Sequence, residues 1–168
     1  MLLLGVWAAA GCTTTAGARR PSDEGAALVV AKLHDAGFRF GTDGSTRALW
    51  GYMTVSHKMV QPLSARPGDV LFFDTDGPDE RPSCESTDHA GVVDRVGGDG
   101  RIAFIEARGG TVRTSYVDPT RPTLRRDARG HIANSFLRPK RVADAPGTRY
   151  FAGEMLCGVA RPLPRPMR

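Results

Sequence analysis

The chain has 168 residues, of which 40% are hydrophobic and 24% are charged, values that are ordinary for a soluble globular protein. This length suits one domain with a single sizeable core, and the composition argues against a disordered chain or a polytopic membrane protein. Lysine and arginine outnumber aspartate and glutamate by 23 to 18. The segments in which lysine and arginine cluster contain no aromatic residues, and no nucleic-acid motif is present, so we do not expect DNA or RNA binding.

The first twelve residues, Met1–Cys12, form an apolar run that is too short to span a bilayer. Such a run is typical of a signal peptide. The small residues directly before Cys12 resemble the lipobox of bacterial lipoproteins, which implies that Cys12 is diacylated and becomes the mature N-terminus. We therefore expect an exported lipoprotein, anchored to a membrane of the bacterial cell envelope, with residues 13–21 as a short tether. The alternative is a plain export signal, or a buried N-terminal segment with an ordinary cysteine.

Two helices are predicted at the start of the domain, which we place at residues 22–161. The first covers Asp23–Ala36, where Ser22 or Asp23 can cap the start and a glycine follows the end. Its surface is almost continuously apolar, so we expect it to be buried. A weaker helical spacing of apolar residues predicts a second helix over Ser45–Val60.

Strands are predicted from residue 70 onward. A turn at Arg66–Asp69 precedes Val70–Phe73, whose β-forming residues suit a buried strand. The glycines of Gly97–Gly100 predict a tight hairpin between two further strands. The predicted strands of this antiparallel meander are Val70–Phe73, Ala90–Val96, Arg101–Arg108 and Thr111–Val117.

The C-terminal third is predicted to be rich in loops. It contains a candidate hairpin around Asp127–Gly130 and a candidate last strand over Glu154–Val159. Three prolines and little core material predict a disordered basic tail over residues 162–168. Helices followed by a separate antiparallel sheet define an α+β domain.

Three short segments in a fixed order resemble the NlpC/P60 and CHAP families of cell-wall amidohydrolases, which share a papain-like fold. They are Arg66-Pro67-Gly68-Asp69 before a strand, Asp88-His89-Ala90-Gly91 at the start of the next strand, and Phe104-Ile105-Glu106 on its hairpin partner. The resemblance implies that His89 is the general base of a cysteine hydrolase and that Glu106 orients its ring. The alternative is that His89 only caps a strand and that Glu106 is a solvated hairpin residue.

The nucleophile that these families require is missing from its expected place. They carry a cysteine at the start of the first core helix, where the helix dipole helps to stabilise a thiolate. In this chain Glu24 or Gly25 stands there, and neither supports thiolate chemistry. Cys84, five residues before His89, is a weak substitute. It is better interpreted as a loop thiol or as a disulfide partner of Cys157, which we otherwise expect in the core.

Other candidate residues indicate no further chemistry. The segment Asp74–Asp79 resembles a calcium loop only superficially, so a turn is expected there. Cys84 and His89 lack the further ligands that zinc needs. We expect no cofactor and no metal, and we expect structural or solvated roles for His34, His57 and His131.

The sequence therefore predicts a monomeric cell-envelope lipoprotein related to peptidoglycan amidases and endopeptidases. Because the thiol is missing, we expect impaired catalysis and a role as a binding module for peptidoglycan or its peptide stem. Two alternatives remain open at this point. One is an active hydrolase that uses His89 with a displaced thiol, and the other is a structural lipoprotein.

Overall fold

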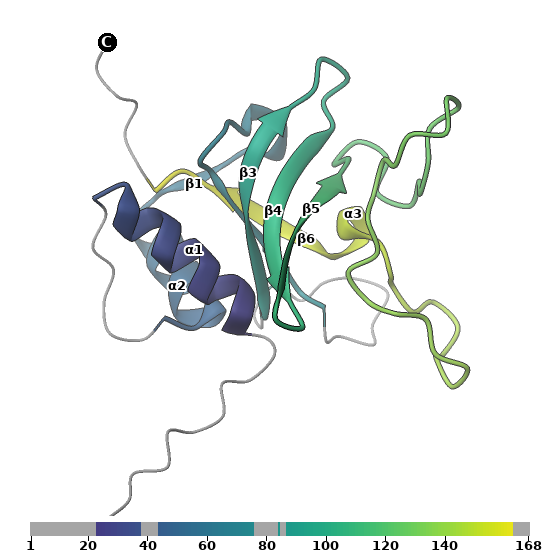
Figure 1. Ribbon diagram of the computed structural model, residues 1–168, viewed down its shortest axis with the longest axis horizontal. Helices are drawn as coiled ribbons and strands as arrows, with labels where there is room; N and C mark the ends of the chain where they lie inside the picture. The colour runs from purple at the N-terminus through teal and green to yellow at the C-terminus, as the bar shows by residue number, and fades with distance from the viewer. Residues whose placement is uncertain (1–22, 38–43, 76–83, 85–86, 163–168) are drawn as a thin grey trace, which may run out of the picture.

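A six-stranded antiparallel sheet forms the centre of the protein (Figure 1). The computed structural model describes residues 23–37, 44–75, 84 and 87–162. The strands lie side by side in the order β1-β6-β2-β3-β4-β5. They are β1 Met59–Val60, β2 Val70–Phe73, β3 His89–Val96, β4 Ile102–Arg108, β5 Thr111–Val117 and β6 Leu156–Ala160. The helical elements are α1 Asp23–Asp35, α2 Thr46–Val55, α3 Ala152–Met155 and a short 3-10 turn, Pro62–Ser64.

These elements confirm the predicted α+β class. None of the helices in the described part of the chain has the length and hydropathy that a membrane-spanning helix needs. Several predicted features lie outside the described residues: the apolar start with Cys12, the tether, the Ser22 cap, most of the segment after Asp74, and residues 163–168 of the tail.

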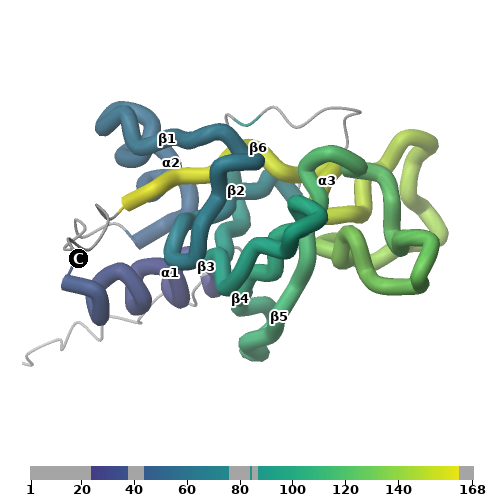
Figure 2. Tube along the Cα trace, turned by 90° about the horizontal axis from the view of Figure 1, so that it is seen from above, coloured from purple at the N-terminus to yellow at the C-terminus, as the bar shows by residue number. Residues whose placement is uncertain are grey.

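Each face of the sheet packs against its own hydrophobic cluster. On one face, Val29 and Leu33 of α1 and Leu49 and Met53 of α2 pack with alternate strand residues such as Phe72. The opposite face packs against α3 and the long segment before it, and its cluster includes Phe73, Phe104, Leu137 and Met155. Figure 2 shows α1 and α2 at one end of the molecule and α3 with the segment before it at the other. All four residues of β2 are buried because neighbouring positions serve opposite faces.

The predicted hairpin between β3 and β4 is confirmed. The N–H of Gly97 donates to the carbonyl oxygen of Arg101 at 2.8 Å, and Gly100 adopts a positive φ of 82°. The candidate hairpin around Asp127 is also present, because Arg126 pairs with Ile132 across it and the Asp127 N–H donates to His131.

The first helix is less buried than its apolar sequence predicts. Ala26, Val29 and Leu33 face the sheet, whereas Ala31 and Lys32 are exposed, so the expectation of a fully buried helix was wrong. A helix that packs on one face of a sheet and faces solvent on its other side buries only one stripe. The predicted glycine stop after it is correct, since Gly37 has a φ of 82° and donates to His34.

The second helix ends five residues earlier than predicted. Ser56 closes α2 through a hydrogen bond to Tyr52, and His57 takes a φ of 54°. Met59 and Val60 then pair with Ala160 and Val159 as strand β1. A long-range strand pairing therefore overrides the local helical spacing of this segment.

The last strand also differs from the prediction. Residues 152–155 form the short helix α3, whose start is capped when the Glu154 carboxylate accepts hydrogen bonds from the N–H groups of Tyr150 and Phe151. Strand β6 then enters the sheet between β1 and β2. The sheet is therefore a β2–β5 meander extended by a strand from the C-terminal end of the chain.

Candidate functional site

His89 and Glu106 lie in contact on adjacent strands. His89 opens β3, and Glu106 lies on β4 opposite Gly91, so the two side chains share one face of the sheet. The Nε2 atom of His89 is 2.5 Å from Oε2 of Glu106. The residues are 4% and 0% exposed, so the alternative of a solvated Glu106 is wrong. The two residues that the sequence predicts as neighbours thus form a buried pair.

The Glu106 carboxylate has further partners that the motif did not include. Its Oε1 atom accepts hydrogen bonds from Ser115 Oγ at 2.5 Å and from Arg113 Nε at 3.0 Å. Arg108 Nη2 lies 3.8 Å from Oε2. The pairing of Glu106 with Arg113 across the β4–β5 hairpin places both residues, and Ser115 diagonally, on one face. A correct prediction of the β4–β5 pairing would therefore have indicated Arg113 and Ser115 as partners of Glu106.

These partners keep Glu106 ionised. Burial by itself raises the pKa of the carboxyl group, but hydrogen bonds from His89 and Ser115, together with the positive charges of His89 and Arg108, outweigh it. The pKa of Glu106 falls from 4.5 to about 2. The carboxylate is therefore an acceptor that fixes the His89 ring through Nε2.

The other ring nitrogen of His89 faces the start of α1. A Cβ atom at position 25 would lie 3.0 Å from His89 Nδ1 and 2.5 Å from the carbonyl oxygen of Ala90. Real Cβ atoms do not approach a backbone oxygen that closely, so only glycine fits here without a shift of the backbone. Gly25 at the start of α1, the His89 imidazole and the Glu106 carboxylate therefore lie in a row.

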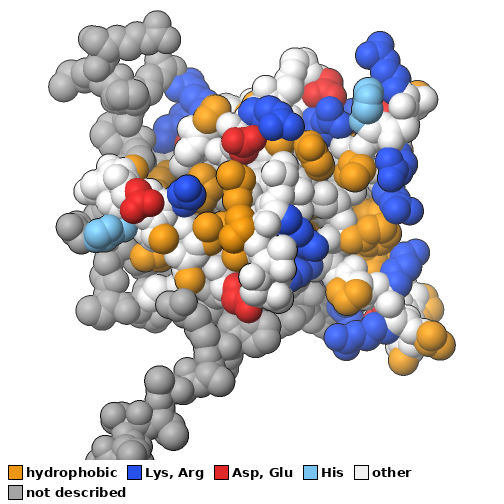
Figure 3. Space-filling view, viewed as in Figure 1, with side chains coloured by type: hydrophobic (Ala, Val, Ile, Leu, Met, Phe, Trp, Pro, Cys, Tyr) orange, Lys and Arg blue, Asp and Glu red, His pale blue; other side chains and the backbone are white. Residues whose placement is uncertain are grey.

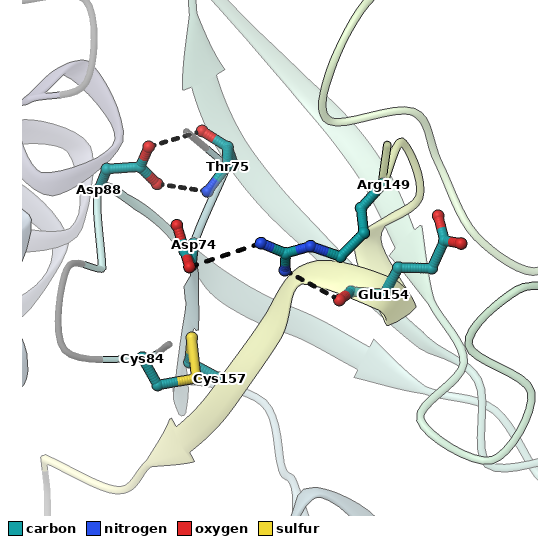
Figure 4. Close-up of a disulfide and its surroundings, with 7 residues drawn as sticks. All are labelled: Asp74, Thr75, Cys84, Asp88, Arg149, Glu154 and Cys157. Carbon is teal, nitrogen blue, oxygen red and sulfur yellow. Dashed lines mark hydrogen bonds and ion pairs between the residues drawn. A yellow bond between two sulfur atoms is a disulfide. The ribbon is translucent and has the colours of Figure 1, made fainter. Parts of the chain in front are cut away.

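No free thiol is found among the described residues. Cys84 and Cys157 form a disulfide that joins the approach to β3 to strand β6 (Figure 4). Of the two interpretations of Cys84, the disulfide partner is therefore correct. The Cys84 sulfur is bonded to Cys157 and therefore cannot act as a nucleophile. Cys157 lies in a strand, half-buried against the cluster that contains Phe72, so the expected core position is met in part, although its sulfur is bonded to Cys84.

The same region fixes the position at which β3 begins. Asp88, next to His89, accepts hydrogen bonds from the N–H and hydroxyl of Thr75 at 2.7 and 2.9 Å. The buried Arg149 lies 3.5 Å from Asp74 and donates to the Glu154 carbonyl oxygen. Figure 4 shows these contacts on either side of the end of β2. Together with the disulfide, they fix the strand end that carries His89.

The remaining candidate residues lie away from this row. His34, His57 and His131 are exposed, and His131 pairs with Asp127 at 3.2 Å. Asp74 is buried beside Arg149 and so is not part of an open ion-binding loop. Among the described residues, no group of three or more His, Cys, Asp or Glu side chains is arranged to hold a metal ion.

Chemically, the row can orient an imidazole but lacks an atom for it to activate. A general base needs a donor within hydrogen-bonding reach, and the position facing Nδ1 has no side chain. Comparisons with protein-family models, with curated proteins and with solved structures found no match to this chain. The function is therefore inferred from the geometry of Gly25, His89 and Glu106.

Proposed function

We propose that this is a cell-envelope protein whose domain is related to the papain-like NlpC/P60 and CHAP hydrolases, and that it binds peptidoglycan without cleaving it. In this proposal His89 and Glu106 are the retained base and orienting residue of an ancestral cysteine hydrolase. Export and attachment to a membrane through a lipidated Cys12 belong to the same proposal.

One observation supports loss of catalysis most strongly: Gly25 occupies the place opposite His89 Nδ1. In a cysteine hydrolase the thiol must lie beside an imidazole that takes its proton, and a helix start favours the thiolate. Here the helix start and the imidazole are both present, and a Cβ atom at position 25 would already lie 3.0 Å from His89 Nδ1. The reactive atom is absent, and the space that it would need is closed by the Ala90 backbone.

Descent from a hydrolase accounts for the buried His89–Glu106 pair better than packing does. A buried ion pair often stabilises a fold no more than apolar residues of the same volume. Packing alone therefore does not favour this pair over apolar residues, whereas the orientation of an imidazole requires such a partner. The active-enzyme alternative needs a thiol near His89, and both cysteines of the described region are consumed by the disulfide.

Two arginines provide a basis for binding at the edge of the former site. The side chains of Arg108 and Arg113 are 27% and 42% exposed and lie beside the fully buried Glu106. Glu24 accepts a hydrogen bond from the Gly110 N–H, which holds the β4–β5 turn against the start of α1. The peptide stem of peptidoglycan carries carboxylates, which guanidinium groups bind well.

Co-sedimentation of the full chain with insoluble peptidoglycan tests this proposal. We expect the protein in the pellet, no soluble muropeptides in the supernatant, and weaker binding of Arg113→Gln. Arg47→Gln, which removes an exposed charge on α2, is the matched control and should bind like the unmodified chain. Release of muropeptides that iodoacetamide abolishes contradicts the proposal, and so does equal binding by both variants.

A further inference from the structure

A cavity of about 280 Å³ lies at the opposite end of β3 from His89. Its lining residues include Arg95, Arg101, Ala103, Tyr116, His131 and Ile132. Arg95 comes six positions after His89 along β3, which corresponds to about 20 Å. The cavity is therefore separate from the His89–Glu106 row. Its volume is close to the lower end of the range for small-molecule sites, which begins at about 300 Å³.

Strand register brings three lining residues together. Arg95, Ala103 and Tyr116 are direct cross-strand neighbours on β3, β4 and β5, so their side chains form one row on one face of the sheet. The small Ala103 leaves space between the two larger residues. Across the three strands, these side chains provide the Arg95 cation, then a shallow floor at Ala103, then the aromatic ring of Tyr116.

Arg101 is held in place at one side of this row. Its Nη1 donates to the Ile132 carbonyl oxygen at 2.8 Å, and its guanidinium lies 5.4 Å from the centre of the Tyr116 ring. An arginine fixed by a carbonyl and an aromatic face loses little further freedom when it binds a planar carboxylate. Tyr116 and Ile132 add apolar surface for the rest of a ligand.

The basic side chains that line the cavity can bind a negatively charged group. Of the described residues that line it, none is acidic, whereas two are arginines and one is a histidine. Asp94 pairs with Arg95 at 2.9 Å, Asp99 lies 3.9 Å from Arg101, and Asp127 pairs with His131. These exposed pairs contribute little stability, so an incoming anion can compete for the cations. Because these three aspartates equal the two arginines and the histidine in number, the cavity has no excess of positive charge, and a dianion is less well accommodated than a monoanion.

We infer that this cavity binds a small carboxylate ligand with an apolar or aromatic portion. The carboxylate lies between Arg95 and Arg101, and the apolar portion packs against Tyr116 and Ile132. Figure 3 shows basic side chains over the upper part of the molecule, where the β3–β4 hairpin lies in Figure 1, and along its right-hand side. The inference is independent of the proposed function, since it uses none of the residues around Gly25, His89 and Glu106.

Hippurate, a benzoylated glycine with a free carboxylate, is a suitable probe because it combines both features. We expect saturable NMR shifts of the Gly97, Ala103 and Ile132 amides, with a dissociation constant on the order of 1 mM. Hippuramide, the neutral amide of the same molecule, should bind at least about tenfold more weakly. Phenyl phosphate, a dianion at neutral pH, should not bind more tightly than hippurate.

Arg95→Gln should raise the dissociation constant about fivefold, whereas Arg47→Gln on the exposed face of α2 should change it less than about twofold. The Arg95 side chain is 64% exposed, so its replacement is not expected to affect folding. The inference is overturned by equal effects of the two variants, by equal binding of hippuramide, by tighter binding of phenyl phosphate, or by the absence of saturable shifts. Peptidoglycan binding is measured separately through Arg113→Gln, so the two proposals can fail independently.

Discussion

Substitution of Gly25 by alanine is the sharpest test of the close contact between α1 and β3. Elsewhere in a helix interior this change stabilises a protein by about 0.5–1 kcal/mol, because glycine loses more backbone freedom on folding. At position 25 the new Cβ meets the Ala90 carbonyl oxygen at 2.5 Å and His89 Nδ1 at 3.0 Å. Both are parts of a rigid, buried strand end, so the helix or the strand must move.

Forced overpacking of this kind costs about 1–3 kcal/mol. Gly51 on α2 provides the matched control, because a Cβ there meets nothing within 4 Å. Gly51→Ala should therefore raise the free energy of unfolding, whereas Gly25→Ala should lower it or leave it unchanged. The difference between the variants should be about 1–3 kcal/mol.

Thermal unfolding followed by circular dichroism measures this difference. For a protein of this size, 1 kcal/mol corresponds to about 2–4 °C in Tm. We expect Gly51→Ala to melt above the unmodified chain, and Gly25→Ala to melt several degrees below Gly51→Ala. If Gly25→Ala is as stable as Gly51→Ala, the reasoning about the start of α1 is refuted.

Three further predictions concern stability and processing. The pKa of Glu106 is lowered from 4.5 to about 2, so its contribution, on the order of 3 kcal/mol, is present above pH 4.5 and lost as the pH falls toward 2. Glu106→Gln should remove that part of the pH dependence in urea titrations, and an unchanged pH profile contradicts this role. The disulfide spans 73 residues, so Cys84→Ser with Cys157→Ser should destabilise the fold by about 4 kcal/mol. A loss below about 1 kcal/mol argues against that estimate. Cells supplied with labelled palmitate should label the chain but not Cys12→Ser, and label retained by the variant excludes lipidation at Cys12.

Local patterns were sufficient to predict the part of the sheet that carries His89 and Glu106. Strands β2 to β4 are adjacent both in the chain and in the sheet, and glycines at 97–100 fix their hairpin. A histidine at the start of one strand and a carboxylate near the end of the next then face each other across the pair. Their contact follows from short-range pairing alone.

Features set by distant parts of the chain could not be predicted in this way. Strand β6 lies between β1 and β2, although about 95 residues separate it from β1 and about 80 from β2. No local propensity encodes such a pairing. For the same reason α2 was expected to continue into residues that β6 recruits as β1. The sequence pattern left Glu24 or Gly25 as the residue opposite the imidazole, and only the packed structure shows that it is Gly25 and how closely it approaches Ala90.

The central claim is that no thiol of the described residues serves the His89–Glu106 pair, and incubation of the full chain with purified peptidoglycan tests it most directly. Soluble muropeptides are measured by chromatography with and without a reductant, since a reductant frees Cys84 and Cys157 from their disulfide. We expect no release of soluble muropeptides above the protein-free control in either condition. Release that requires the reductant, or that is lost in both Cys84→Ala and His89→Ala, contradicts it.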